Sequence, residues 1–232
     1  LLLTGTLFAQ ANNVFTLNPS VNSAGMGNVG IANADVKNVF HNPAFVGLKE
    51  SHQEISYVDW LPNLTDDMGY QSILYTSDLG WSTEIFYFNY GTQIEADQGG
   101  IIIGDFESSS YRVSGGYGFG IGDWMFGARL NLYNHNFIDS FDIDMNYGFD
   151  LGAYKEFGNT SLGIVLKDVG GETKFLDQEL NLPMSVGIGV GQKLGNFTLA
   201  SDVKIYEDYN SIGLGGVYDL GIASLKLGYY TE

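Results

Sequence analysis

The chain has 232 residues, of which 44% are hydrophobic and 16% are charged, so it is long enough to form one sizeable domain. Its net charge of −17 argues against binding to nucleic acid, or to anionic lipid through a basic patch. Because the chain contains no Cys, it has no disulfides and no thiolate metal sites. The 32 Gly, 15 Tyr and 15 Phe, with only 4 Pro, are typical of many packed antiparallel strands joined by tight turns.

Residues 1–11 begin with an apolar run, Leu1 to Phe8, which is too short to span a bilayer. The run ends at the small residues Ala9 and Ala11, which suit a signal peptidase, so we interpret residues 1–11 as the remnant of a secretory signal peptide. The alternative is an ordinary buried first strand. Because no charged region and no initiator Met precede the run, we expect the natural chain to begin earlier.

Residues 12–50 differ in composition from the rest of the chain. They are rich in Gly, Ala, Ser and Asn, and they lack both the alternation of a strand and the apolar stripe of a helix. Such a segment buries too little apolar surface to fold alone, so we expect it to be a plug enclosed by the rest of the chain. We expect a helical turn only in Asp35 to Phe40, because Pro43 prevents a helix through Asn42.

Residues 51–232 are predicted to be strands throughout, with tight Gly-containing turns alternating with longer polar connections. The long connections are Glu95 to Phe106, Asn134 to Ser140 and Asp168 to Asn181. The eleven predicted strands lie near Gln53 to Asp59, Met68 to Ser77, Trp81 to Thr92, Ser108 to Phe119, Asp123 to Asn134, Asp139 to Glu156, Thr160 to Lys167, Leu182 to Lys193, Asn196 to Tyr206, Asn210 to Leu220 and Ile222 to Tyr230.

Apolar and polar residues alternate most clearly between Asp123 and Tyr154. The run from Phe141 to Ala153 has about seven alternations, which exceeds the roughly 5 to 6 residues of a soluble strand and meets the roughly 9 to 11 of a tilted membrane strand. We expect the polar face to line the inside of a barrel and its carboxylates to hold the plug. The polar residues of these two strands that we assign to the lumen are Arg129, Asn131, Asp142, Asp144 and Asp150.

Alternation alone does not distinguish a membrane barrel from a soluble sandwich, which would bury the same apolar face. The strand length, the signal remnant and the aromatic residues near strand ends, such as Trp60, Trp81 and Trp124, favour an antiparallel transmembrane β-barrel of the outer membrane. Bacterial barrels of this class close with an even number of strands. We therefore expect the eleven strands to be part of a larger barrel that is truncated at its C-terminal end.

Two short motifs in the plug resemble a known family. Gly25-Met26-Gly27 and Asn42-Pro43-Ala44, followed by Trp60 to Leu64, resemble the start of the PorV/PorQ family, and PorV most of all. The stretches Leu182-Pro183-Met184 and Ala200 to Val203 are also similar. Members commonly have Gly directly after Asn-Pro-Ala, whereas here Phe45 follows.

The resemblance implies an outer-membrane barrel of about fourteen strands from the type IX secretion system of Bacteroidota, related to the FadL transporters. Such a protein would bind secreted cargo through the cargo's C-terminal signal domain. It would then pass the cargo to the surface attachment machinery, with no catalysis and no cofactor of its own. The partners implied are outer-membrane lipid, secretion-system proteins and cargo.

Three other motifs fail on their details. Gly25 to Gly30 matches the G-x-G-x-x-G of dinucleotide sites, but no strand precedes it and no βαβ unit follows. Asp142 to Asn146 resembles the opening of a calcium loop, yet Tyr147 and Ala153 stand where Gly and Glu are required. The His residues are scattered at positions 41, 52 and 135 without ligand spacing, so we expect neither a metal site nor an enzyme.

Two other functions remain open besides the secretion carrier. The first is a FadL-like outer-membrane channel for hydrophobic compounds, in which the plug closes a pocket for a hydrophobic ligand. The second is a soluble, secreted β-protein used in adhesion, which requires the apolar face from Phe141 to Ala153 to be core.

Overall fold

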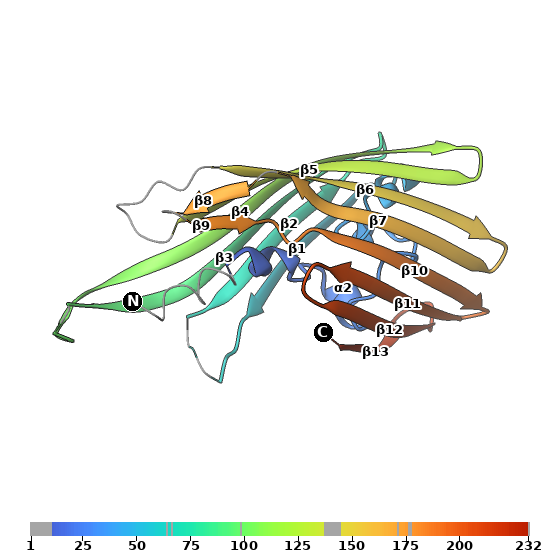
Figure 1. The fold of residues 1–232 in the computed structure, drawn as a ribbon. Coiled ribbons are helices and arrows are strands. Elements are labelled where there is room, and N and C mark those ends of the chain that lie inside the picture. The colour runs from blue at the N-terminus through green and yellow to red at the C-terminus, as the bar shows by residue number, and fades with distance from the viewer. Residues whose placement is uncertain are drawn as a thin grey trace.

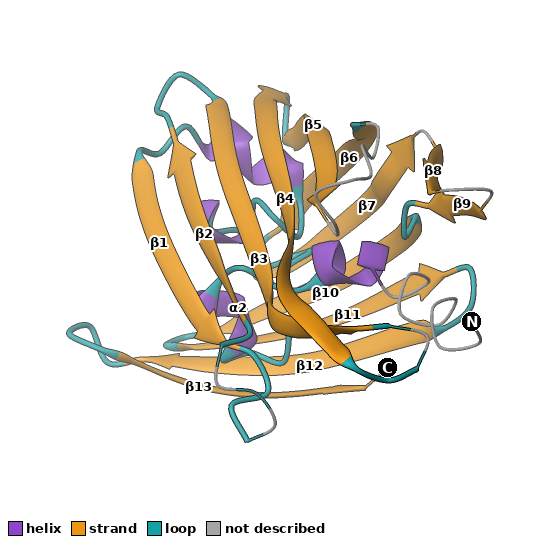
Figure 2. Cartoon of the chain, turned by 90° about the vertical axis from the view of Figure 1, so that its left-hand side faces the viewer, coloured by secondary structure: helices purple, strands orange, loops and turns teal. Residues whose placement is uncertain are grey.

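A computed structural model of the chain describes residues 11–63, 65, 67–97, 99–136, 145–170, 172–175 and 178–231. Among these residues, eleven strands form one antiparallel sheet that curves round a segment of short helices (Figure 1, Figure 2). Neighbours in the sheet follow chain order, so β1 and β13 stand at its two edges. The fold is all-β and is that of an outer-membrane β-barrel, as the sequence predicts.

The strands of the main sheet agree with the eleven predicted ones. The predicted loop from Asp168 to Asn181 is wrong, because β7 continues to Gly170 and a separate two-stranded hairpin follows before β10. The strands of the sheet are β1 (His52–Asp59), β2 (Gly69–Thr76), β3 (Trp81–Ala96), β4 (Ile102–Ile121), β5 (Trp124–Asn136), β6 (Asn146–Phe157), β7 (Thr160–Gly170), β10 (Ser185–Leu194), β11 (Phe197–Tyr206), β12 (Asn210–Asp219) and β13 (Ser224–Thr231). The hairpin consists of β8 (Glu172–Phe175) and β9 (Gln178–Asn181).

The two faces of the wall differ as the alternation predicts. On β6, Phe149 and Leu151 are 47% and 53% exposed on the outside, whereas Asp150 between them is 1% exposed on the inside. On β5, Leu130 faces outward, and Arg129 is buried on the inner face. An apolar outer face and a polar inner face suit a wall that has hydrocarbon outside it.

The two rims of the sheet have different connections. At one rim β4–β5, β6–β7, β10–β11 and β12–β13 are joined by tight turns, each with a Gly at positive φ. We call this end the short-turn rim. The opposite end, where β1–β2, β3–β4, β5–β6 and β7–β10 connect, we call the long-loop rim; in outer-membrane barrels the longer loops face the outside of the cell.

The predicted loop from Glu95 to Phe106 is wrong, because most of it is strand. β3 and β4 continue to pair from Thr92 with Glu107 up to Ala96 with Ile102, beyond the point where β2 and β5 have ended. The carboxylate of Asp97 accepts from the backbone N–H of Gly99 and Ile101 at 2.8 and 2.9 Å and so closes the turn. The result is a two-stranded ribbon that projects from the long-loop rim (Figure 1).

The plug also contains more helix than the single turn predicted at Asp35 to Phe40. Its helical pieces are η1 (Ala11–Thr16), α2 (Val21–Ala24), η2 (Val36–Asn38) and η3 (Pro43–Leu48). Each piece is too short to show helical periodicity in the sequence. η3 does begin at Pro43, where the side-chain oxygen of Asn42 accepts from the N–H of Ala44 at 3.0 Å and caps the helix. No helix in the described part of the chain is long and apolar enough to cross a membrane.

The orientation of the wall can be tested at Leu151, which lies on the outer face in the middle of β6. We expect Leu151→Arg to lower the free energy of unfolding in lipid vesicles by about 2–4 kcal/mol, the cost of a charge at the bilayer midplane. Ile102→Arg is the matched control, because Ile102 is exposed on the ribbon beyond the other strands. Urea titration in vesicles measures both values, and equal costs at the two positions would contradict the membrane placement.

Candidate functional site

The plug lies directly against the inner face of the wall, because the wall presents Gly where the two meet. An ideal Cβ added to Gly127 would stand 2.1 Å from the carbonyl oxygen of Pro43, and one added to Gly163 would stand 2.1 Å from that of Ile31. No side chain fits at such distances. The other inward Gly with a plug atom within 3 Å of an added Cβ are Gly118, Gly152, Gly187, Gly189, Gly191, Gly213, Gly215 and Gly228.

One carboxylate of the wall holds the middle of the plug. Asp202 on β11 is fully buried, and its Oδ2 accepts from the backbone N–H of Gly30 at 2.7 Å and of Ile31 at 2.9 Å. Lys204 on the same strand donates to the carbonyl oxygen of Asn28 at 3.0 Å. Hydrogen bonds from backbone N–H groups to a charged acceptor are among the stronger ones, so this strand fixes residues 28–31 of the plug.

The Asn42-Pro43-Ala44 motif is buried between the plug and β5–β6. The amide nitrogen of Asn42 donates to the carbonyl oxygen of Ile31 at 2.8 Å and to that of Ala153 on β6 at 3.3 Å. Asn42 and Ala44 have no exposed surface. The motif therefore joins two parts of the plug to each other and to the wall.

The Gly25-Met26-Gly27 motif is positioned on β12–β13. Gly27 adopts φ +68°, and a Cβ there would stand 2.6 Å from the backbone nitrogen and oxygen of Tyr229. Met26 is buried with Val29 against Ala200. Gly25, by contrast, has φ −63° and only ordinary contacts, so nothing in the structure requires Gly there.

A buried charge network lies on the inner faces of β3–β6. Glu84 on β3 pairs with Arg112 on β4 at 2.9 Å and with Arg129 on β5 at 2.7 Å. Arg129 Nε lies 3.8 Å from the carboxylate of Asp150 on β6. Asn131 accepts from Arg129 Nε at 2.8 Å and from Ser114 at 2.7 Å. Two positive and two negative side chains thus balance in the interior.

The plug enters this network through two of its own residues. Arg112 Nη1 donates to the carbonyl oxygen of Phe15 at 2.8 Å. The ring of Phe40 lies under the guanidinium carbon of Arg112, 5.0 Å from the ring centroid, and Lys167 Nζ approaches the same ring to 3.7 Å. These contacts are cation–π interactions. The charges that keep the wall's interior polar therefore also hold the plug.

Above the charge network, toward the long-loop rim, the lumen is aromatic. Phe15 of the plug packs against Tyr133 at 4.7 Å between ring centroids, His135 at 5.0 Å and Phe86 at 6.4 Å. We call this group the aromatic cluster; it consists of Phe15, Tyr70, Phe86, Phe88, Tyr133 and Leu182. Trp60 and Tyr90 pack on its edge. A plug residue is thus packed within an aromatic cluster of the wall.

A cavity of about 210 Å³ lies beside the aromatic cluster, between the plug and the wall. Trp60, Tyr70 and Leu17 form its apolar side. Its polar side includes His41 and Lys204. The cavity can hold a small molecule that has an apolar ring or chain on one side.

His41 separates this cavity from the centre of the plug. Its Nε2 lies 2.9 Å from the hydroxyl of Ser23, and its ring stands where a Cβ on Gly30 would be. Burial lowers the pKa of His41 well below its usual range, and the positive charges of Lys204 and Lys167 lower it further. The ring is therefore neutral at pH 7.

The predicted lumenal residues are brought together only in part. Arg129, Asn131 and Asp150 are buried on the inner face within one network. Asp142 and Asp144 lie outside the described residues. Among the described residues no group of three His, Asp or Glu is placed to hold a metal ion.

Sequence reasoning missed Glu84, Arg112 and Asp202. Each could have been recognised in the sequence as a single charged residue at one of the alternating, inward-facing positions of an aromatic or Gly-rich strand. Glu84, which lies between the inward-facing Ser82 and Phe86, is an example. The inward Gly were visible as a period of two in the stretch from Gly187 to Gly191. The sequence did not show that these Gly contact the plug.

Comparison with known proteins shows similarity in the fold alone. No protein-family model and no curated protein matches the chain. Among solved structures, the Pseudomonas putida toluene transporter TodX matches with a TM-score of 0.55 at 12% identity, covering 90% of this chain and 82% of that one. A TodX deltaS2S3 mutant, described as a monoaromatic hydrocarbon channel, matches with a TM-score of 0.58 at 13% identity, covering 91% and 82%.

The plug contact can be tested at Gly163. We expect Gly163→Ala to destabilise the docked plug by about 1–3 kcal/mol, because its methyl group overlaps the Ile31 carbonyl. Gly115→Ala is the control, since a Cβ at Gly115 meets nothing within 4 Å. As the chain has no Cys, spin labels can be placed on Val21→Cys and Leu220→Cys. Pulsed electron paramagnetic resonance should show a broader distribution of the distance between the two labels only for Gly163→Ala.

The docking of the plug should depend on pH through His41. Because the pKa of His41 is lowered in the folded protein, its contribution to plug docking is fully present above the unfolded pKa of about 6.5 and is lost as the pH falls below it. The same spin-label distance should therefore broaden as the pH falls below about 6.5. His41→Gln should remove most of this dependence, and an unchanged pH profile in that variant would contradict the assignment.

Proposed function

We propose that the chain is a channel of the bacterial outer membrane that carries hydrophobic compounds, and that its plug controls the path. The observation that carries the proposal is the aromatic cluster, in which the plug side chain Phe15 is packed, together with the 210 Å³ cavity beside it. A compound that enters from the outside would meet Trp60 and Tyr90 before it meets the plug. Neither catalysis nor a cofactor has a part in the proposal.

The size of the cavity supports a small apolar ligand. An apolar cavity of about 150 Å³ in another protein holds benzene, so a cavity of 210 Å³ has the volume for a single ring that carries a polar substituent toward its polar side, where His41 and Lys204 lie. The ring of Tyr70 and the indole of Trp60, whose centroids are 6.0 Å apart, offer faces for stacking. The fold neighbours described as a toluene transporter and a monoaromatic hydrocarbon channel support the same ligand class.

The plug supports a controlled path rather than an open pore. The Gly contacts and Asp202 hold residues 26–31 and 42–44 against the wall. The N-terminal part of the plug is attached differently, through Arg112 and the aromatic packing of Phe15. An apolar ligand can replace the ring of Phe15 in its packing against the wall. It cannot replace the backbone contacts that the plug makes with the inward Gly.

The second candidate is the secretion carrier implied by the resemblance of Gly25-Met26-Gly27 and Asn42-Pro43-Ala44 to the PorV/PorQ family. The ribbon of β3 and β4 favours it, because Ile94, Ile102 and Ile103 are exposed beyond the other strands. Exposed apolar residues of this kind mark contact sites for other proteins. In this proposal the ribbon would contact cargo or a secretion-system protein at the cell surface.

The channel is tested by uptake of labelled toluene into cells that lack other routes for it. We expect expression of the full chain to raise the rate, and Phe15→Ala to raise it further, because removing the ring leaves space within the aromatic cluster. Phe119→Ala is the control, since Phe119 is exposed on the outer face of β4. A rate equal to that of empty cells for both wild type and Phe15→Ala would contradict the channel.

The secretion carrier is tested by native pull-down from outer membranes with protein identification by mass spectrometry. Recovery of translocon proteins or of cargo with a shared C-terminal domain, lost in Ile102→Asp/Ile103→Asp, would support it. Recovery of the barrel without them would leave the channel as the better proposal.

A further inference from the structure

The cavity beside the aromatic cluster has a positive charge in its lining and, among the described residues that line it, no carboxylate. The charge belongs to Lys204, and the polar residues near it, such as His41 and Ser211, are uncharged at pH 7. The whole chain has 27 acidic residues against 10 Lys and Arg. In a chain of that composition, an enclosed site with a cation and no acidic residue is selective for anions.

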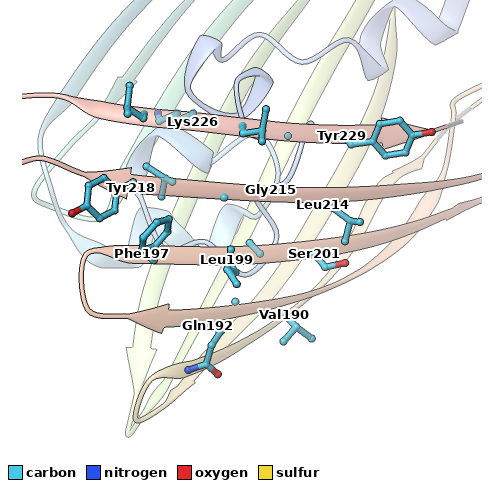
Figure 3. A pocket seen from close by; sticks show the side chains of 17 residues that line it. Val190, Gln192, Phe197, Leu199, Ser201, Leu214, Gly215, Tyr218, Lys226 and Tyr229 are labelled. Carbon is cyan, nitrogen blue, oxygen red and sulfur yellow. The ribbon is translucent and has the colours of Figure 1, made fainter.

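Lys204 reaches the cavity because it lies on the inner face of β11. Phe197 and Leu199 of this strand are exposed on the outer face (Figure 3), and Lys204 has the opposite parity. Asp202, two positions earlier, also faces inward, but its carboxylate accepts from the plug backbone and does not line the cavity. The acidic residue nearest to Lys204 along the inner face is therefore used to hold the plug.

The plug fixes the position of the Lys204 ammonium group. Lys204 Nζ donates to the carbonyl oxygen of Asn28 at 3.0 Å, and the side chain of Asn28 in turn accepts from the amide of Asn18 at 2.9 Å. A carbonyl oxygen is neutral, so it orients the ammonium group without cancelling its charge. An ammonium group has three N–H donors and no acceptor, which suits it to a carboxylate.

Two further residues make the same side of the cavity favourable for an anion. Ser211 on β12 lies directly across from Lys204 in the sheet and carries a hydroxyl donor. The charge of Lys204 also contributes to the lowered pKa of His41, which lines the cavity as well. A positive charge that opposes protonation of a neighbouring ring attracts an anion to the same space.

The opposite side of the cavity suits an aromatic ring. Trp60 follows β1 and Tyr70 lies on β2, so these rings are on the other side of the plug from β11. The hydroxyl of Tyr70 donates to the carbonyl oxygen of Asn18 at 3.2 Å, which holds its ring in place. The cavity thus has an aromatic side and a cationic side, and its volume of about 210 Å³ suits one ring with a small substituent.

We propose that the cavity binds an aromatic carboxylate, with the ring against Trp60 and Tyr70 and the carboxylate at Lys204. Benzoate is the simplest member of this class. The inference rests on the proposed function, because it takes this cavity as the ligand site of the channel. It goes further by assigning a negative charge to the ligand and a residue that recognises the charge.

The proposal is tested by isothermal titration calorimetry of the purified full chain in detergent at pH 7. Benzoate, toluene and benzylammonium present a similar ring with a negative charge, no charge and a positive charge. We expect the wild type to bind benzoate about tenfold or more tightly than toluene, the effect of a hydrogen bond to a charged group, and benzylammonium most weakly. This series needs no variant, so it decides the question even if the Lys204 variants fail to fold.

Variants then assign the preference to Lys204. Lys204→Met should lower the affinity for benzoate about tenfold or more and change that for toluene less than about twofold. Lys193→Met is the matched control, because it changes the net charge equally but removes an exposed Lys that does not line the cavity. Lys204→Arg keeps the charge and should retain the preference for benzoate. Heat-modified electrophoretic migration reports the folding of each variant.

The failure of this inference differs from the failure of the channel. Equal affinities of the wild type for benzoate and toluene, or the same loss of benzoate binding in Lys193→Met as in Lys204→Met, would overturn the anion site and leave the channel in place. Binding of neither ligand would overturn the site as well. Tight binding of benzoate without any uptake of toluene by cells would support the site and contradict the hydrocarbon channel.

Discussion

The close contact between the plug backbone and the inward Gly of the wall is the constraint on which the rest of the structure depends. A Cβ at Gly163 or Gly127 would overlap a plug carbonyl, so these strands can carry no inward side chain where the plug passes. The plug in turn has no large apolar face of its own and is ordered by backbone contacts, Asp202 and Asn42. Wall and plug thus specify each other's conformation.

The interior charges complement this contact. Glu84, Arg112, Arg129 and Asp150 balance one another, and removing one partner of such a buried group typically costs about 3–5 kcal/mol because the other charge is left uncompensated. Arg112 and Phe40 connect the group to the plug. The lumen therefore has a centre held by charge pairs and, toward the long-loop rim, the aromatic cluster. In the proposed channel, the hydrophobic ligand binds at the aromatic end and the plug closes the polar end.

The sequence predicted the strands and their faces, because apolar and polar residues alternate with a period of two and the chain has few helical signals. This pattern is typical of strands with one apolar and one polar face. Arg129, Asn131 and Asp150 were placed by parity alone. Their partner Glu84 was missed, since a contact across 45 residues leaves no local pattern. The ribbon at Glu95 to Phe106 was mistaken for a loop, because its acidic residues and three Gly are typical of loops although β3 and β4 still pair there. The helical turns of the plug depend on its enclosure and had no periodicity to reveal them.

In the proposed channel, the aromatic cluster with Phe15 in it and the neighbouring cavity form the path for small apolar rings. Diffraction from crystals of the full chain soaked in 4-bromotoluene tests this most directly, because the anomalous signal of bromine locates the ligand without reference to any side chain. The account predicts a bromine peak in the cavity between Trp60, Tyr70 and Leu17. A peak only on the outer face of the wall, or none at saturating ligand, would contradict it.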